Sequence, residues 1–411
     1  MDEVDTGGWA PPDPALTGGP GEPSGEASPA HGRPDPARPP GAAVPPHGAW
    51  PAAQGAAADE QPPYGPVPYG PAPYAAPYGR PPAPQPWIVE APEGTPYHQM
   101  ARTAVQRWWR PVAGTAAIAL TGMAALMAVT FAWLIAVAAG TGTPLMEVIG
   151  RIGGPDDPML GSLNAELAFT LLSVAVFLPF ILLAAPVFQR RRPGTLSSVA
   201  GRLRLRWMAV CAGLAVLTGV VGVVFSWAAG VMVDDPVTEG GAWVGWSSFL
   251  PTLLIVVLLV PFQSAAEEYF FRGWLLQAIG SCTLQDRTAP LARKLSVVFR
   301  TPWPAICAGG LAFAAGHGYT GWGVVDIFGF AVIAGWVTVR TGGLEAAIAV
   351  HVVNNVGAFL IPAAVGRLSL EQGAVPLPYV VADLLPLLLY AACVDRLARR
   401  RRVQTVTAAS G

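Results

Sequence analysis

The chain has 411 residues, of which 52% are hydrophobic and 12% charged, with a formal net charge of −1. A soluble domain typically carries about 25% charged residues, so this composition argues against a water-soluble fold and indicates a membrane protein. The near-neutral balance gives no reason to expect a nucleic-acid partner. The four cysteines show no CxxC spacing, so we expect neither a disulfide framework nor a zinc motif from them.

Residues 1–100 are rich in proline, glycine and alanine and contain the tract PPYGPVPYGPAPYAAPYGRPP. Such a segment buries too little apolar surface to offset the entropy lost on ordering, which predicts a disordered cytoplasmic tail with polyproline stretches. It lacks the charged, apolar and cleavage regions of a signal peptide. Two interpretations remain open: the tail binds a cytoplasmic partner, or it is a spacer, which is the favoured one.

Eight apolar stretches follow, each able to cross roughly 30 Å of hydrocarbon. We therefore expect an all-α, polytopic membrane protein with about eight transmembrane helices. The fifth and sixth stretches are the shortest. The eight lie at 113–139, 166–188, 207–231, 248–279, 302–319, 322–340, 343–362 and 376–395.

Arginines are concentrated in alternate loops of this pattern. They precede the first stretch, join the second to the third (190–206) and the fourth to the fifth (287–300), and follow the eighth as RLARRRR. The opposite loops carry aspartates and glutamates instead. Because basic loops are retained in the cytoplasm, this predicts a multi-pass protein of the cell membrane with both termini cytoplasmic.

A few polar side chains interrupt three of the apolar stretches. An ionisable group near the bilayer centre costs about 2.5–3.5 kcal/mol on insertion scales, so such groups are expected to be paired or functional. At 1.5 Å per residue, three of them lie roughly 20–24 Å from the cytoplasmic ends of their helices. The three are Glu267, His317 and Asn355. A shared depth on three helices predicts one polar cluster.

Helical spacing separates two neighbouring glutamates of the fourth stretch. Glu268 and Arg272 are four residues apart and are expected to form an ion pair on one helix face. Glu267 is rotated by about 100° from Glu268 and has no such partner on its own helix.

The chemistry of the cluster suggests hydrolysis. A carboxylate in an apolar pocket suits a general base that takes a proton from water, which we assign to Glu267. An imidazole, His317, can share that water, and the Asn355 amide can donate to a developing oxyanion. His351, four residues before Asn355, completes the site by orienting that amide or by binding the carbonyl.

Three sequence elements resemble the motifs of the CPBP family of intramembrane proteases, also called the Abi or type II CAAX prenyl protease family. They are EEYFFR (267–272), FAAGH (313–317) and HVVNN (351–355), in this order and each on its own stretch. The resemblance covers roughly residues 248–362. It implies an eight-helix intramembrane endopeptidase that cleaves a membrane-associated protein or peptide within the bilayer.

The resemblance also implies residue roles and a division of the chain. Glu267 and His317 would activate water, Asn355 with His351 would form the oxyanion side, and Glu268 and Arg272 would support them. Residues 101–247 would hold the N-terminal transmembrane helices, 248–362 the catalytic transmembrane core, and 363–411 the last transmembrane helix with a basic cytoplasmic tail.

Three alternatives stay open. A zinc-dependent version of the same protease would use the same histidines and glutamates. The metal-free version is favoured, with no cofactor expected, because catalytic zinc usually takes three protein ligands in tight geometry. A transporter would also place ionisable groups in the membrane, but the spans show no internal repeat. A non-catalytic scaffold would explain the tail but not the polar cluster.

Overall fold

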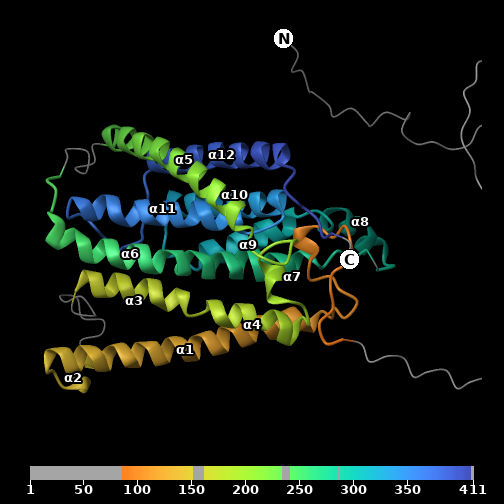
Figure 1. Ribbon diagram of the computed structural model, residues 1–411, viewed down its shortest axis with the longest axis horizontal. Helices are drawn as coiled ribbons and strands as arrows, with labels where there is room; N and C mark the ends of the chain where they lie inside the picture. Colours follow the sequence, from red (N-terminus) through yellow and green to blue (C-terminus); the bar gives the residue numbers. More distant parts are fainter. Residues whose placement is uncertain (1–85, 151–161, 234–240, 286, 409–411) are drawn as a thin grey trace, which may run out of the picture. The chain divides into compact units, whose positions relative to one another are not determined.

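The computed structural model describes residues 86–150, 162–233, 241–285 and 287–408. These residues form helices joined by turns, and they contain isolated β-bridges but no β-strand. The expected all-α class is confirmed. Figure 1 shows the α-helices, which are α1 (Trp109–Thr141), α2 (Leu145–Gly150), α3 (Leu163–Ala175), α4 (Leu178–Phe188), α5 (Leu205–Met232), α6 (Trp246–Glu267), α7 (Leu276–Gly280), α8 (Pro290–Phe299), α9 (Trp303–Ala315), α10 (Trp322–Thr341), α11 (Glu345–Ala364) and α12 (Leu377–Arg400).

Seven helical runs in the described residues are long and apolar enough to cross a membrane, which makes the chain a multi-pass membrane protein. Each corresponds to one predicted stretch: α1, α3 with α4, α5, α6 through α7, α10, α11 and α12. Many of their large apolar side chains are exposed on the outer surface, where lipid replaces water as the neighbour.

The helix at the fifth predicted stretch, 302–319, is shorter than predicted. This helix, α9, has 13 residues, about 20 Å, and is too short to cross the hydrocarbon alone. The preceding helix α8 meets α9 at a bend of 71°, so an eighth span exists only if this pair counts as one. Pro302 explains the break, because a proline disfavours the helical conformation of the residue before it.

The fourth span is unusual because it changes helix type within the membrane. Helix α6 continues without a break into a π-helix, η5 (Glu268–Leu275), and then into α7. A π-helix is wider than an α-helix, is rare, and is found mostly at functional positions. Two prolines, Pro251 and Pro261, lie inside α6, and the second precedes the π-helix by two turns.

Helix α11 occupies a central position, packed between α5 on one side and α6 on the other (Figure 1). Helix α5 also packs along α12, and α10 packs against α9 and α12. On the far side of α6, α3 packs against it and α1 covers α4. Glu268 and Arg272 of η5 and His351 of α11 are therefore buried inside the bundle rather than exposed on its lipid-facing surface.

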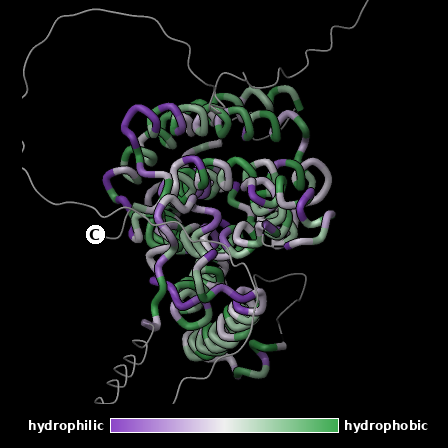
Figure 2. Tube along the Cα trace, turned by 90° about the vertical axis from the view of Figure 1, so that its right-hand side faces the viewer, coloured by the Kyte–Doolittle hydropathy of each residue, from purple (hydrophilic) through white to green (hydrophobic). Residues whose placement is uncertain are grey.

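The strap, defined here as residues 86–103, covers the end of the bundle where the last residues of the chain also lie. Figure 2 looks onto this end and shows hydrophilic stretches in its loops beside largely hydrophobic helices. The predicted tail was assigned residues 1–100; of these, 1–85 lie outside the described residues, whereas 86–100 are folded. Tyr97, in the 3-10 turn η2 (Tyr97–Gln99), is fully buried, and its hydroxyl donates to the Leu196 carbonyl at 2.5 Å.

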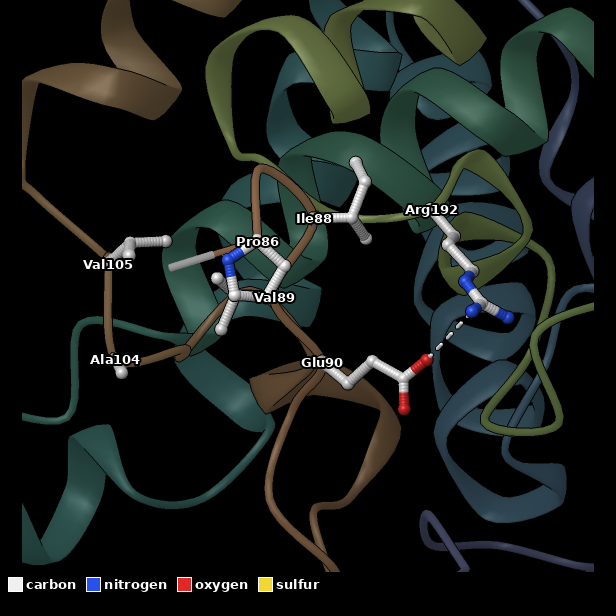
Figure 3. Close-up of a pocket in the computed structure, with 7 residues that line it drawn as sticks. All are labelled: Pro86, Ile88, Val89, Glu90, Ala104, Val105 and Arg192. Carbon is white, nitrogen blue, oxygen red and sulfur yellow. Dashed lines mark ion pairs between the residues drawn. The ribbon is translucent and has the colours of Figure 1, made fainter. Parts of the chain in front are cut away.

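The strap is held by its buried groups more than by its surface charges. A cavity of about 560 Å³ lies beside it, and none of the motif residues lines that cavity (Figure 3). At its edge Glu90 and Arg192 form an exposed ion pair at 3.4 Å, a type worth about 0–1 kcal/mol. Further along, the Thr407 N–H donates to the Thr95 carbonyl and the Thr95 N–H donates to Thr407 Oγ1, while Pro96 and Val406 form a β-bridge.

Candidate intramembrane site

The structure brings four of the six predicted site residues into direct contact. Glu267, at the end of α6, and Glu268 and Arg272, on η5, meet His351 from α11. His317 follows α9, and Asn355 lies one turn beyond His351.

Glu268 is the shared acceptor of this group. Its Oε1 accepts from Arg272 Nη1 at 3.0 Å and from His351 Nδ1 at 2.7 Å. The Glu268 side chain is fully buried and that of Arg272 is 3% exposed. The predicted Glu268–Arg272 ion pair is therefore present. A buried pair of this kind offsets the cost of desolvating both charges only when it is well hydrogen-bonded.

Two aromatic rings complete the surroundings of Arg272. Its guanidinium lies 4.3 Å from the ring centroid of Phe313 on α9 and 5.8 Å from that of Phe330 on α10. Cation–π contacts contribute about 2 kcal/mol or more when they are desolvated. The first phenylalanine is the start of the FAAGH motif, so one motif residue stabilises the charge of another.

Glu267 is held more loosely than Glu268. Its Oε2 lies 3.2 Å from His351 Nε2, but the pair is not aligned as a hydrogen bond. The Glu267 side chain is 12% exposed, in contrast to the fully buried Glu268. Of the two adjacent glutamates, Glu267 thus keeps its carboxylate available for another partner.

His317 presents one ring nitrogen away from its own helix. Its Nδ1 is 2.8 Å from the Phe313 carbonyl, which accepts only if Nδ1 carries the proton. In the neutral ring this leaves Nε2 as an acceptor. The ring is half-buried and stacks near Tyr319 with centroids 6.2 Å apart. His317 lies within electrostatic range of Glu267.

Asn355 contacts a residue that the sequence analysis missed. Its Nδ2 donates to Gln263 Oε1 at 3.0 Å, across the interface of α11 and α6. Gln263 is 7% exposed and precedes Glu267 by four residues, so both lie on one face of α6. The i−4 spacing from Glu267 was the available signal. His351 and Asn355 do not hydrogen-bond to each other, as an orienting role of His351 would require. Both side chains of α11 face the α6–η5 helix, where His351 bonds Glu268 and Asn355 bonds Gln263.

Asp383, which has no role in the sequence analysis, is hydrogen-bonded to Asp326 between α12 and α10. Two carboxyl groups form such a bond only when they share a proton. This pair is separate from the Glu268–Arg272 group, and we assign it no function.

The arrangement of these side chains also bears on the zinc-dependent alternative. Among the residues that the structure describes, no three histidine, cysteine, aspartate or glutamate side chains are arranged to hold a metal ion. Both nitrogens of His351 face glutamate oxygens, and Glu268 is bonded to Arg272. This arrangement does not fit the three-ligand geometry of a catalytic zinc.

Comparison with known proteins adds an independent finding. Residues 246–357 match the family model described as type II CAAX prenyl endopeptidase Rce1-like. The chain is also 34% identical over 111 residues to the uncharacterized protein YyaK of Bacillus subtilis (strain 168), covering 26% of this chain and 33% of that protein. The match thus spans about a third of the relative's length. No solved structure matches. Residues 246–357 of this multi-pass protein are thus similar to the type II CAAX prenyl endopeptidases, and this match covers the three motifs that resemble the CPBP family.

Proposed function

We propose that the protein is an intramembrane endopeptidase that hydrolyses a peptide bond of a membrane-associated protein or peptide with water activated by Glu267. The observation that supports it best is the unequal binding of two adjacent glutamates. Glu268 Oε1 accepts from both Arg272 and His351 in a fully buried side chain, whereas Glu267 is partly exposed and has no aligned hydrogen bond. A general base needs such an available carboxylate next to its water.

In the proposed reaction, Glu267 takes a proton from a water molecule that His317 Nε2 also holds. The water oxygen forms a bond to the scissile carbonyl carbon, and the carbonyl electron pair moves to its oxygen. Glu267 then returns the proton to the amine nitrogen as the carbon–nitrogen bond breaks. His351, close to both glutamates, orients Glu267 for these two transfers.

Asn355 is proposed to stabilise the negative oxygen. An amide nitrogen carries two hydrogens, and Gln263 uses one of them. The second remains for the oxyanion, in an amide whose orientation is already fixed. Donors that are pre-oriented in this way contribute most because they need no reorganisation during the reaction.

No cofactor is part of this proposal, and the zinc-dependent alternative is kept as an outcome of the test. We also propose that both termini are cytoplasmic, because the basic loops lie at that end. The proline-rich stretch within residues 1–100 would then be placed to bind a cytoplasmic partner. Accessibility of single cysteines at the two termini in sealed, oriented vesicles tests this topology, and labelling of either terminus from the extracellular side contradicts it.

The test of the activity is proteolysis of a library of membrane-inserted peptides by the purified chain in nanodiscs. We expect cleavage by the wild type, a loss of at least about 10²-fold in Glu267→Gln, and no effect of a chelator. Glu371→Gln, the same change at an exposed position, is the matched control and should cleave like the wild type. Loss of cleavage on chelation would establish the metal-dependent version. Equal cleavage by Glu267→Gln and wild type would refute the role of Glu267.

A further inference from the structure

Helix α8 does not share the direction of the spanning helices. It has ten residues, about 15 Å, and is turned by 71° from α9. It lies at the end of the bundle that also holds the strap and the last residues of the chain (Figure 1). A helix this short cannot cross the hydrocarbon, so its exposed apolar surface needs another explanation.

One face of α8 is an exposed apolar stripe. Leu291, Leu295 and Val298 are 68%, 41% and 52% exposed. They are spaced by four and three residues and therefore lie along one side of the helix. None of the helices in the described residues covers this stripe; α8 packs on α9 through its other side, where Ser296 is buried.

The rest of the exposed surface of α8 carries two cations and one further large apolar side chain, Val297, which is 60% exposed. Arg293 and Lys294 lie on it, and Arg287 and Arg300 flank it. The sequence from Arg287 to Arg300 contains no acidic residue. An apolar stripe beside cations is the pattern of a helix that lies in the interface of a membrane with anionic lipids.

The end of α8 is fixed to the strap. The Arg300 carbonyl is 3.2 Å from His98 Nε2 and accepts from Gln99 Nε2 at 3.1 Å. Two exposed tryptophans, Trp108 before α1 and Trp303 at the start of α9, lie at the same end of the bundle. Tryptophans gather at the membrane–water boundary, which places α8 at headgroup level.

We infer that α8 is a docking surface for the anionic phospholipids of the surrounding bilayer. Its apolar stripe enters the boundary of the acyl chains, and its cations contact headgroup phosphates. Each cation strengthens attachment to an anionic surface roughly fivefold. Because only three residues separate α8 from α9, this docking also sets the membrane depth of Phe313 on α9 and of His317, which follows α9 and ends the motif.

The test uses a spin label in nanodiscs made of phosphatidylcholine alone or mixed with phosphatidylglycerol. The label is placed at Leu295→Cys, with Arg293→Cys as the control on the charged side. Both are built in a chain whose three more accessible cysteines, Cys282, Cys307 and Cys393, are replaced by alanine. Frequent collision of the label with oxygen shows that the label lies in lipid. Frequent collision with a water-soluble nickel complex shows that it lies in water.

We expect the label at 295 to collide with oxygen and to be shielded from nickel. This shielding should be stronger in nanodiscs that contain phosphatidylglycerol. The label at 293 should be accessible to nickel. Replacing two cations, in R293Q/K294Q carrying the 295 label, should lower the docked-to-undocked ratio roughly 25-fold in the anionic nanodiscs. R202Q/R206Q, with two exposed arginines removed elsewhere, should leave that ratio unchanged.

Three results would overturn the inference. The first is a label at 295 that nickel reaches in both lipid mixtures. The second is equal burial in both mixtures with no effect of R293Q/K294Q. The third is dipolar broadening between labels, which would show that a second copy of the chain covers the stripe. The readout is independent of proteolysis, so failure of the proposed activity would not affect it.

Discussion

Glu268 and Arg272 place opposite charges 3.0 Å apart on the π-helix η5, in side chains that are fully or almost fully buried. Removing one charge from such a pair leaves the other buried without compensation, which costs about 3–5 kcal/mol. We therefore expect Glu268→Gln to lower the thermal stability of the purified protein strongly. Glu267→Gln, next to it, should change stability little because Glu267 has no aligned hydrogen bond.

The control for this difference is the double variant Glu268→Gln/Arg272→Met, which removes both charges. Its unfolding temperature should lie above that of Glu268→Gln alone. A single variant as stable as the wild type would contradict the structural role of Glu268.

The Asn355–Gln263 contact predicts graded losses of activity. Asn355→Ala removes the proposed oxyanion donor and should lower kcat by about 10²–10³-fold. Gln263→Leu keeps Asn355 but no longer fixes its amide, so we expect a smaller loss in kcat with KM little changed. Kinetics with one cleaved peptide distinguish these outcomes. Equal losses in both variants, together with lower unfolding temperatures, would instead indicate a packing role for the pair.

The strap should detach at acidic pH because of His98. Burial lowers the pKa of His98 from its usual value of 6.5, although the bond to the Arg300 carbonyl partly opposes this. The folded strap thus prefers the neutral ring, whereas the released strap binds a proton below pH 6.5. The contribution of His98 to stability is complete above that value and is lost as the pH falls below it.

Hydrogen exchange of the strap between pH 7.5 and 5, corrected for intrinsic rates, measures this release. We expect protection to fall on acidification in the wild type. His98→Gln, which cannot take up the proton, should show a pH-independent level. A wild-type strap whose protection rises at low pH would contradict the sign of the effect.

Close packing of α1 on η5 depends on Gly114. A Cβ at this position would overlap the buried indole of Trp274, whose Nε1 donates to Thr115 Oγ1 at 2.8 Å. Gly114→Ala should therefore lower the free energy of unfolding by about 1–3 kcal/mol. Gly213→Ala is the control, since a Cβ there meets nothing within 4 Å. Comparable stabilities of the two variants in thermal unfolding would refute this.

The features that depend on local sequence were predictable. Long apolar runs gave the spans, and the i,i+4 spacing gave the Glu268–Arg272 pair, which forms even though the helix there is of the π type. Contacts between helices were not predictable, because they depend on how each helix is rotated about its axis. Spacing on α11 suggested that His351 orients Asn355, but both side chains face α6 and η5 and bind Glu268 and Gln263 there.

Two further features had no readable signal. The strap is composed like the tail before it, and the residue that holds Thr95 is 312 positions away in the sequence. The fifth stretch was apolar enough to cross the membrane, but its helix ends at Ala315, four residues before the predicted end, and a bend separates its start from α8.

The pairing of Thr95 with Thr407 also orders events during synthesis. The ribosome makes Thr95 before any of the spans and Thr407 only after α12. The bundle therefore remains open at this end until α12 and the residues up to Thr407 have been made. A chain that stops after Arg402 would keep every span yet leave the strap without its β-bridge. Quality control at this membrane could thus distinguish finished molecules from unfinished ones by a few backbone hydrogen bonds outside the bilayer.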